Sequence, residues 1–411
     1  MRILLLVDKF YPIPHANGIC VSKIINSFKN VEEVHVICRA KIKKVSETIK
    51  MENGWTVHVI NEDLNYVGHN VKFLSSVLSA LDSVFLFRAR RGSFYLNMRK
   101  EAEIVLEKHK CNVVISVINP IESGTVGEYL KSNHKGLKLL IYDLDTISNK
   151  SLNIFEKAFF LLHRYYAFKI EKEMFKLADV IVHLKQHEAH FKANKYSKFA
   201  YKTLFQDIPL LYIQEQGKNP NHNNIENCTY IYAGKFYKRI REYKQLLRIF
   251  KQMPEIFSFR IYTDEPFFSA IKKDYSADSR FQLSKLVDEE TLRDAMEKAS
   301  FLVGYGNKKS CMFPSKIITY IGFCKPIIHV YQNDKDPVLH FLRAYPDVLF
   351  LDARSSIEVN VAKLKSFISK KHEEIDWHNV FDMYRSCDPG ACSFEIEKLL
   401  VGELEEQNET L

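Results

Sequence analysis

The stretch MFPSKIITYIGFCKPIIH holds the residues best suited to bind an anion. Pro314 favours the first position of a helix, and Ser315 can satisfy unpaired backbone amides there. Lys316 adds a cation near the positive end of the helix dipole. This combination is suited to a phosphate group, although an ordinary capped helix joined to a strand has the same pattern.

The helix that carries these residues is expected to end near Gly322 and to lead into a buried strand, Ile327 to Val330. Other apolar runs in the C-terminal half predict strands, and two segments with helical periodicity lie between them. The predicted strands are TYIYAGKF, SFRIYTDE, RFQLSKLV, FLVGYG and DVLFLD, and the predicted helices run from Glu242 to Gln252 and from Glu289 to Ala299.

The N-terminal half shows the same alternation of short apolar runs and helical segments. The predicted strands are ILLLV, EVHVICRA, WTVHVI, NVVISVI, KLLIYDLD and ADVIVHL. Short buried strands that alternate with helices indicate doubly wound parallel sheets. We therefore predict an α/β protein made of two Rossmann-like domains in tandem.

The domain boundaries follow from changes in this pattern. Residues 1–205 form the first predicted domain, and the polar, asparagine-rich residues 206–228 form the linker. Residues 229–375 form the second domain. Residues 376–411 are predicted to be helical, with a break at Asp388-Pro389-Gly390, and to cross back onto the first domain. The final GELEEQNETL is expected to be disordered.

The composition excludes several classes of protein. The net charge is +9, and the excess of cations lies in the N-terminal half, which suits a phosphorylated substrate or an anionic membrane. No nucleic-acid-binding module accompanies it. No uncharged run approaches the roughly 20 residues that a membrane span needs, so we expect a cytoplasmic protein. The eight cysteines form no CxxC pair, which indicates reduced, structural thiols.

Taken together, these features resemble the GT-B glycosyltransferases, and within them the large retaining family 4, also called glycosyl transferases group 1. Sucrose synthase and bacterial lipopolysaccharide and capsule enzymes typify that family. The resemblance implies two Rossmann-like domains with a central cleft and a C-terminal helix that crosses back. It also implies a small-residue loop after the first strand that approaches the donor phosphates, here His15-Ala16-Asn17-Gly18, with only one glycine.

The family's second domain opens with a strand, a Gly-Arg-Leu and a later Lys-Gly, whose cations hold the nucleotide diphosphate. Here Gly234 is followed by Lys235 in the arginine position, and Arg241 falls near the lysine position. The resemblance implies that both cations bind the donor, with a changed geometry because arginine is bidentate and lysine is not. A solvated basic turn is the alternative.

Two further segments resemble the family's donor site. The loop after a strand contacts the base in the family, which here implies the backbone near Leu286 and Val287. Many members also bracket the Pro-Ser-Lys helix with two glutamates, and the corresponding positions are Cys311 and Thr319. A threonine hydroxyl binds a ribose more weakly than a carboxylate does, so donor identity and turnover are both open.

Several polar residues of the first domain are candidates for acceptor binding. Asp143 and Asp145 end a predicted strand, and Asp145 is assigned as a base or orienting group on the acceptor side. An Asp-x-Asp metal site of the GT-A type is the competing interpretation. Glu122 follows another strand end, and His15 lies in the first loop. Stabilisation by a helix dipole explains Glu122 as well. His183 and His187 lack a third ligand for a metal.

Two amphipathic segments, 71–91 and 155–176, combine aromatic residues with cations. Such helices bury their apolar side in their own domain or dock on an anionic inner membrane. The second interpretation makes the protein a peripheral membrane protein.

The sequence therefore predicts a transferase of EC 2.4 type that moves a sugar from a nucleotide-diphosphate donor to a bacterial glycan or lipid-linked acceptor, with retention. Lys235, Arg241, Ser315 and Lys316 would stabilise the leaving diphosphate, so that no metal or other cofactor is needed, and Pro314 is assigned to the donor-binding site. The alternatives are a sugar-nucleotide epimerase of the same fold and a non-catalytic binding subunit.

Overall fold

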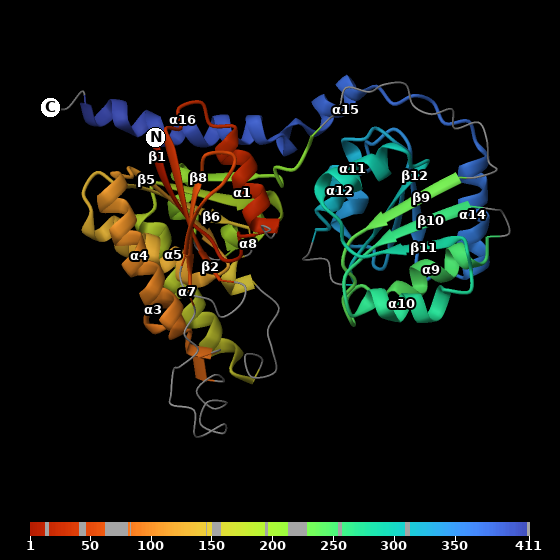
Figure 1. Ribbon diagram of the computed structural model, residues 1–411, viewed down its shortest axis with the longest axis horizontal. Helices are drawn as coiled ribbons and strands as arrows, with labels where there is room; N and C mark the ends of the chain where they lie inside the picture. Colours follow the sequence, from red (N-terminus) through yellow and green to blue (C-terminus); the bar gives the residue numbers. More distant parts are fainter. Residues whose placement is uncertain are drawn as a thin grey trace. The chain divides into compact units, whose positions relative to one another are not determined.

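The computed structural model describes residues 1–12, 16–40, 47–61, 81–82, 84–144, 146–149, 158–193, 196–212, 228–253, 257–308 and 313–408. The chain forms two compact units (Figure 1). The first consists of Met1–Pro209 and Pro389–Leu411, and the second of Leu210–Asp388.

The first unit is built on a sheet with eight strands among the described residues, in the order β3-β4-β2-β1-β5-β6-β7-β8. Neighbouring strands are parallel except β3 and β4. The strands are β1 (Arg2–Leu6), β2 (Glu33–Arg39), β3 (Glu47–Lys50), β4 (Thr56–Ile60), β5 (Val113–Ile118), β6 (Lys138–Asp143), β7 (Val180–Leu184) and β8 (Thr203–Gln206).

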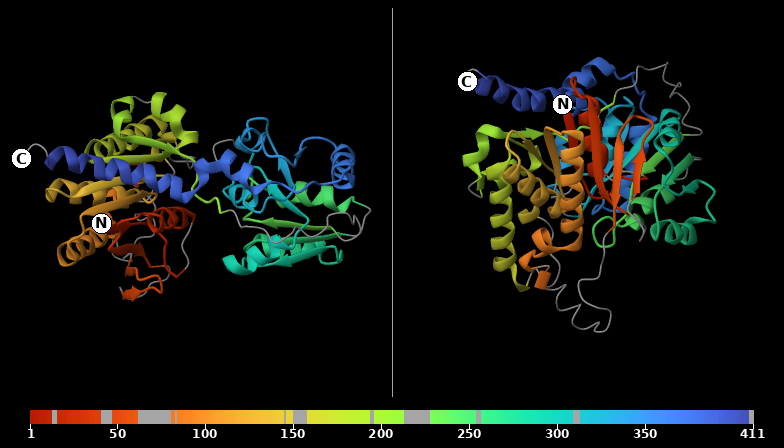
Figure 2. Two further views of the ribbon diagram at one scale, coloured as in Figure 1. Left: turned by 90° about the horizontal axis from the view of Figure 1, so that it is seen from above. Right: turned by 60° about the vertical axis from the view of Figure 1, so that its left-hand side comes forward.

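Helices cover both faces of this sheet. The α-helices are α1 (Ala16–Asn26), α3 (Arg88–Arg91), α4 (Ser93–His109), α5 (Ile121–Asn133), α7 (Phe160–Leu177), α8 (Glu188–Ala193) and α16 (Pro389–Asn408), with 3-10 turns η1 (Ile147–Asn149), η2 (Lys185–His187) and η3 (Ser197–Lys202). Helices α4, α5 and α7 pack side by side on one face, and α1 packs with α16 (Figures 1 and 2). Right-handed crossovers place α1 and α5 on opposite faces, because β2 and β6 lie on opposite sides of the first strands.

The second unit is built on a sheet with six parallel strands among the described residues, in the order β11-β10-β9-β12-β13-β14. The strands are β9 (Cys228–Ala233), β10 (Phe257–Tyr262), β11 (Phe281–Ser284), β12 (Phe301–Tyr305), β13 (Ile327–Tyr331) and β14 (Val348–Asp352). The helices are α9 (Tyr243–Lys251), α10 (Phe267–Tyr275), α11 (Glu289–Glu297), α12 (Lys316–Ile321), α13 (Pro337–Phe341), α14 (Ile357–Ser369) and α15 (Trp377–Tyr384), followed by the 3-10 turn η4 (Arg385–Cys387).

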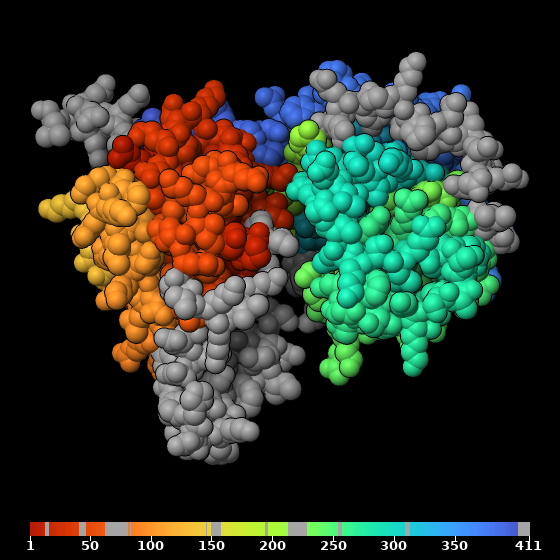
Figure 3. Space-filling view, in the orientation of Figure 1, coloured from red at the N-terminus to blue at the C-terminus, as the bar shows by residue number. Residues whose placement is uncertain are grey.

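Each unit has its own apolar core beneath its helices. The core of the second unit is rich in aromatic rings, and Tyr230, Phe250 and Phe259 of β9, α9 and β10 contact one another. In the space-filling view, the surface of this unit that faces the reader is mostly green to cyan, the colours of the segments from β9 to α11 (Figure 3). The prediction of two Rossmann-like parallel sheets is confirmed.

Every predicted strand is present, and two strands of the described residues, β3 and β8, were missed. The exposed β3 pairs antiparallel at the sheet edge and is not apolar, and β8 is short and only half-buried. Helix α16 begins at Pro389, which suits the first helical position, so the expected break is the start of a new helix. The helix continues to Asn408, which differs from the disorder expected for GELEEQNETL. Glutamate and leucine favour helix extension there.

No helix among the described residues is both long and apolar enough to span a bilayer. Most of the predicted amphipathic segment 71–91 lies outside the described residues. Residues 160–176 of the second segment lie in α7, which buries Ala167, Met174 and Phe175 against the sheet. Its first turns leave Phe160, Leu161 and Tyr165 exposed.

Candidate functional site

The carboxyl edge of the second sheet is where several predicted donor ligands lie. The strand order puts β9 beside β12, and the chain leaves these two strands toward opposite sides of the sheet. In Rossmann-like folds, ligands bind beyond the carboxyl ends of the strands at such a switch point. The loops after β9 and β12 therefore form the candidate site.

The loop after β9 brings two cations together. Gly234 and Lys235 directly follow the strand, and Arg241 closes the loop. The backbones of Tyr237 and Arg241 pair with N–O distances of 3.0 and 2.8 Å, so the loop folds back on itself. Arg241 Nη1 consequently lies 3.5 Å from the carbonyl oxygen of Lys235. Two positive side chains thus leave one tight loop at the strand end.

Arg241 is held in place by the loop after β12. Its Nε donates to Oδ1 of Asn307 at 2.9 Å, and the backbone oxygen of Asn307 accepts a bond from Asn333 Nδ2 at 2.8 Å. Gln332 Nε2 donates to the backbone oxygens of Gly306 at 2.6 Å and Ile240 at 3.2 Å. The loops after β9, β12 and β13 are therefore joined. Sequence reasoning missed Asn307, although its place directly after a predicted strand was a signal.

Lys235 is paired with a carboxylate in this structure. Its Nζ lies 3.1 Å from Oδ2 of Asp264, which follows β10, and both side chains are partly exposed. A phosphate that binds Lys235 must compete with Asp264, and an exposed ion pair of this kind is worth only about 0–1 kcal/mol. The pair therefore presents little obstacle to ligand binding.

Helix α12 approaches the same strand end. The backbone N–H of Ala233, the last residue of β9, donates to the hydroxyl of Tyr320 at 3.0 Å. Residues four apart share one face of a helix, so Lys316 lies one turn before Tyr320 on the face toward β9. Lys316 is exposed, and Pro314 and Ser315 are half-buried. The helix and strand predicted around this motif are both present.

The prediction that Ser315 caps α12 with its side chain is wrong. Ser315 makes no side-chain cap hydrogen bond, because its backbone is already helical, with φ −56° and ψ −25°. A capping side chain needs an extended backbone at that position. The amides of Ile317 and Ile318 instead bond to the backbone oxygens of Pro314 and Ser315. The tight first turn therefore begins at Pro314.

Lys325, in the Gly-x-x-Lys-Pro part of the motif, has a structural role. Its Nζ is buried and donates to the backbone oxygen of Ala299 at 2.8 Å, and its own carbonyl accepts from the Tyr345 hydroxyl at 2.8 Å. Burial lowers the pKa of its ammonium group to about 8. Lys325 thus braces the starts of β12 and β13, at the edge of the sheet opposite the candidate site.

Three other predicted donor ligands lie on the second unit. Leu286 and Val287 are exposed in the loop between β11 and α11. Asp288 ends this loop and caps α11 by accepting from the backbone N–H of Thr291 at 2.8 Å. Thr319 is half-buried in α12, three residues after Lys316. Cys311 lies outside the described residues.

Asn17 and Gly18 are in the first turn of α1, not in a loop as predicted, because the helix begins at Ala16. They still follow β1 at the carboxyl edge of the first sheet. Glu122 is also in a first turn, that of α5, and is buried. His15 and Asp145 lie outside the described residues, so their predicted roles stay predictions.

Asp143 ends β6 and is fully buried. Its Oδ2 lies 3.1 Å from Nδ1 of His183, which is opposite it on β7. The carboxyl group of Glu171 on α7 is also buried, and the negative charge of Asp143 helps to raise its pKa. The structure therefore places Asp143 among buried groups of its own unit.

Glu171 is the titratable residue that sequence reasoning missed. Its carboxylate accepts from the backbone N–H of Ser148 at 3.0 Å, from the Ser148 hydroxyl at 2.7 Å and from the Tyr196 hydroxyl. Burial, followed by the negative charge of Asp143, raises the pKa of Glu171 to about 7. The signal was its position in α7, where it shares a stripe with the buried Ala167, Ile170 and Met174.

We expect Glu171→Gln to remove a pH dependence of stability. The carboxyl pKa is raised from 4.5 to about 7 on folding, so the native protein holds a proton that the unfolded chain has lost. The stability that this bound proton contributes to the folded protein is fully present below pH 4.5. It falls as pH rises to about 7, by at most about 1.4 kcal/mol per pH unit. Glu171→Gln should therefore gain stability relative to the wild type across this range. Urea denaturation at several pH values measures it.

The exposed Glu188 supplies the control for this prediction. It pairs with Lys192 one turn away on α8, so Glu188→Gln removes one carboxylate from the same unit without touching the buried Glu171 contacts. The pKa of His190, lowered by burial to about 4, adds a slope of opposite sign, and His190 contacts the same Ser148 hydroxyl at 2.9 Å. Parallel profiles for the wild type and Glu171→Gln would contradict the assignment.

Comparisons with known proteins give the fold. No protein-family model and no curated protein sequence matched this chain. Among solved structures, sucrose-phosphate synthase from Thermosynechococcus elongatus is similar over 100% of this chain and 99% of its own, with a TM-score of 0.62 and 13% identity. A lipopolysaccharide outer core galactosyltransferase is similar over 98% and 100%, with a TM-score of 0.55 and 12% identity.

UDP-GlcNAc 2-epimerase from Neisseria meningitidis, solved with UDP-GlcNAc bound, is similar over 98% of this chain and 100% of its own, with a TM-score of 0.53 and 12% identity. The chain has the GT-B fold. GT-B proteins of different activities match it about equally well, so the likeness does not separate a transferase from an epimerase.

Proposed function

We propose that this GT-B chain is a glycosyltransferase that takes its sugar from a nucleotide-diphosphate donor. The observation that supports this most is the arrangement at the switch point of the second sheet. Lys235 and Arg241 leave one tight loop, Arg241 is oriented by Asn307, and α12 is joined to the end of β9 by Tyr320. Fixed cations of this kind suit the charge that builds on a departing diphosphate.

In this proposal the second unit binds the donor through its own side chains. Arg241 has its Nε engaged with Asn307, which sets the plane of the guanidinium for bidentate contact with phosphate oxygens. Lys235 and Lys316 act as point charges. The backbone near Leu286 and Val287 meets the base, Thr319 meets the ribose, and Gly234 allows close approach of the donor.

We propose a front-face displacement with retention of configuration. The C–O bond from the sugar to the diphosphate breaks as the acceptor oxygen bonds to the same face of the sugar. The acceptor proton passes to the departing phosphate oxygen. The cations stabilise the negative charge of that leaving group in the transition state, which lowers the barrier electrostatically. The proposed mechanism then needs no metal ion or other cofactor.

We assign the acceptor, a hydroxyl of a glycan or lipid-linked saccharide in bacterial surface polysaccharide synthesis, to the carboxyl edge of the first sheet. Asn17, Gly18 and Glu122 lie in the first turns of helices that follow β1 and β5 there. His15 and Asp145 are proposed to contact the acceptor from the same edge. Asp143, which is buried against His183, would position its neighbours rather than touch the acceptor.

The start of α7 supports a membrane-associated acceptor. Phe160, Leu161 and Tyr165 are exposed there, and the cation Arg164 lies between them in the chain. Exposed aromatic and aliphatic side chains beside cations bind anionic bilayers. We expect the protein to sediment with vesicles that contain anionic lipid and less with neutral vesicles. Equal sedimentation with the two kinds of vesicle would exclude this surface. So would a Leu161→Ser variant that sediments with anionic vesicles as well as the wild type does.

A nucleotide-release assay with UDP- and GDP-sugars and candidate acceptors tests the proposed transferase. Release of nucleoside diphosphate that depends on the acceptor, with the sugar appearing on the acceptor, is the expected result. An epimerase would interconvert the sugar nucleotide without any acceptor, and a binding subunit would bind it without either reaction. Calorimetry with the same donors separates the last two outcomes.

A further inference from the structure

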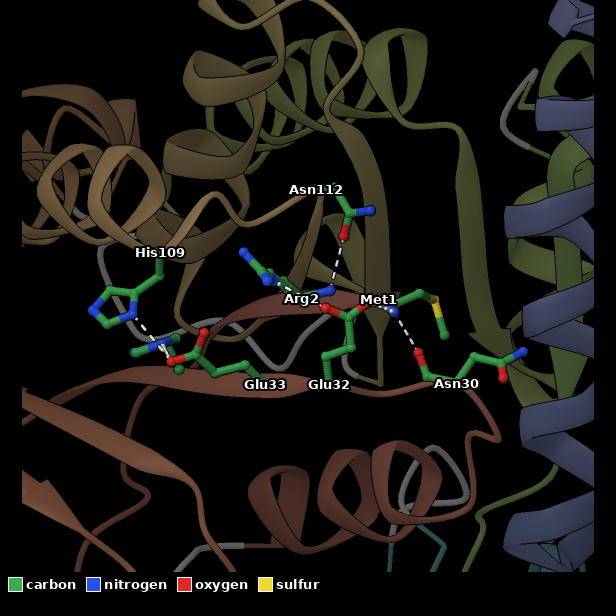
Figure 4. A network of polar contacts seen from close by, with 8 residues as sticks. Met1, Arg2, Asn30, Glu32, Glu33, His109 and Asn112 are labelled. Carbon is green, nitrogen blue, oxygen red and sulfur yellow. Dashed lines mark hydrogen bonds and ion pairs between the residues drawn. The ribbon is translucent and has the colours of Figure 1, made fainter.

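A second group of titratable side chains lies at the amino edge of the first sheet, where the parallel strands begin. Glu33 begins β2, and His109 is the last residue of α4, which runs back antiparallel to the strands. Figure 4 shows the His109 ring directed at the Glu33 carboxylate, beside the contacts that join Arg2 to Asn112 and to Glu32. This amino edge is separate from the carboxyl edges that carry the proposed function.

Two imidazoles converge on a single carboxylate oxygen. Oε1 of Glu33 lies 2.8 Å from Nε2 of His35 and 3.1 Å from Nδ1 of His109. One ligand atom from each of these residues lies within 4.8 Å of the other two. His35 is fully buried on β2, whereas Glu33 and His109 are partly exposed. A small ion can therefore reach the three atoms from solvent.

His35 is held from behind by a second histidine and a second carboxylate. Its Nδ1 lies 3.1 Å from Nε2 of His58 on β4, and Nδ1 of His58 lies 3.0 Å from Oε1 of Glu101 on α4. The Thr48 hydroxyl is more distant from His58, at 3.5 Å. Polar contacts thus run without interruption from Glu33 through His35 and His58 to Glu101.

This chain of contacts has one N–H proton fewer than it needs for every contact to be a hydrogen bond. It has three links, Glu33 to His35, His35 to His58, and His58 to Glu101. Each link needs one proton, but two neutral imidazoles supply only two. A metal ion bound to both Glu33 and His35 at the exposed end takes the place of the missing proton in the first link.

We propose that Glu33, His35 and His109 bind one divalent transition-metal ion of the zinc class. Glu101 and His58 fix the ligand that His35 presents. If Glu101 accepts the proton on Nδ1 of His58, then Nε2 of His58 accepts the proton on Nδ1 of His35. Nε2 of His35 is left with its lone pair toward the site. Metal-binding histidines are typically oriented in this way by a carboxylate behind them.

The ligand set defines the class of metal. Two imidazole nitrogens and one carboxylate oxygen suit Zn²⁺ and similar borderline ions, whereas Mg²⁺ and Ca²⁺ prefer ligand sets made of oxygen. Three protein ligands leave further positions for water. Because the site joins the start of β2 to the end of α4, the bound ion would stabilise the first unit.

Titration of the untagged full-length protein with Co²⁺ and Zn²⁺ tests the proposal. We expect one Co²⁺ per chain, with a change in visible absorption as nitrogen ligands replace water, and displacement by Zn²⁺ but not by equimolar Mg²⁺. His109→Ala should weaken binding by at least about tenfold, because even the loss of a supporting group behind a ligand has an effect of that order.

His134 provides a matched control. It is as exposed as His109 and also pairs with one glutamate, Glu103, at 2.7 Å, but among the described residues it has no third ligand group. His134→Ala should leave Co²⁺ affinity unchanged. Equal affinity in the wild type and His109→Ala, or no stoichiometric binding by the wild type, would overturn the proposal.

Glu33→Gln keeps the shape of the ligand and guards against misfolding of the alanine variant. It should fold and yet lose the rise in melting temperature that Zn²⁺ gives the wild type. An equal rise in both proteins would contradict the site. Neither result depends on sugar transfer, so failure here and failure of the proposed function are distinguishable.

Discussion

Replacing Lys316 by alanine is expected to weaken the binding of nucleoside diphosphates by about 1.5–3 kcal/mol, which is the usual contribution of a hydrogen bond to a charged group. The loss is roughly tenfold to more than a hundredfold in dissociation constant. Lys316 lies one turn before Tyr320, whose hydroxyl is bonded to Ala233 at the end of β9. Calorimetry with UDP and GDP measures the change.

The control for this experiment is an exposed lysine at the opposite edge of the same sheet. Lys273 lies in the last turn of α10, which leads to the start of β11. Lys273→Ala changes the net charge of the unit by the same amount but removes the charge far from the proposed phosphate, so its affinity should be close to that of the wild type. Equal affinities for Lys316→Ala and Lys273→Ala would show that Lys316 does not meet the phosphate.

The salt dependence of binding gives a second check on Lys316. Direct contact between a cation and phosphate is screened by salt, so the difference between wild type and Lys316→Ala should shrink as ionic strength rises. A difference that persists unchanged in high salt would indicate altered packing of α12 instead. Thermal denaturation of the free protein separates these cases, because altered packing of α12 would lower its melting temperature.

The strands and their order of appearance were predictable because parallel strands covered on both faces are continuous apolar runs. Runs such as Val113–Ile118 and Val180–Leu184 are buried throughout. The exposed β3, Glu47–Lys50, has no such run. Apolar runs in the sequence therefore predicted the buried strands of the sheets and missed the exposed strand β3 at the edge.

The partners of the candidate site residues were not predictable, because they are distant in the sequence. Lys235 and Arg241 were identified as a pair of cations, but the bond from Arg241 to Asn307 joins residues 66 apart in the chain. Only the strand order brings the loops after β9 and β12 together. The chemistry of a side chain is local, whereas its orientation is set by the fold.

The histidine cluster did leave a trace in the sequence. The stretch VHVI occurs twice, at Val34–Ile37 and Val57–Ile60, and puts a histidine at a buried strand position each time. In the sheet, Ile37 lies opposite His58 and His35 lies opposite Thr56, so the two histidines share a face. A polar residue that interrupts an apolar strand is a signal to be examined, as Glu171 is in α7.

Replacing Asp336 by alanine is expected to destabilise the second unit by about 2–4 kcal/mol. Oδ2 of Asp336 lies 3.1 Å from Nε2 of His329, and both side chains are almost fully buried. Removing the carboxylate leaves the imidazole without this partner, which costs about 1–3 kcal/mol. Oδ1 also caps α13 by accepting from the backbone N–H of Val338 at 3.0 Å, worth about 1 kcal/mol.

This stability is coupled to the candidate site through the strand end of β12. A Cβ on Gly306 would lie 1.8 Å from Asp336 Oδ2, so the carboxylate packs directly under the backbone that precedes Asn307. Loss of the carboxylate should therefore loosen the support of Arg241 and reduce nucleotide affinity even where the variant is folded. Urea denaturation and calorimetry measure the two effects.

Two further variants, one conservative and one a control, test the interpretation of Asp336→Ala. Asp336→Asn keeps one oxygen that can cap α13, and its Nδ2 can donate to Nε2 of His329 in the other imidazole tautomer, so it should recover most of the stability. Asp334 lies two residues earlier in the same loop and pairs with Arg354 at 2.9 Å while exposed to solvent, so Asp334→Ala should cost at most about 1 kcal/mol. A loss at Asp334 as large as that at Asp336 would mean that loop charge, and not the buried His329 contact, holds this edge of the sheet together.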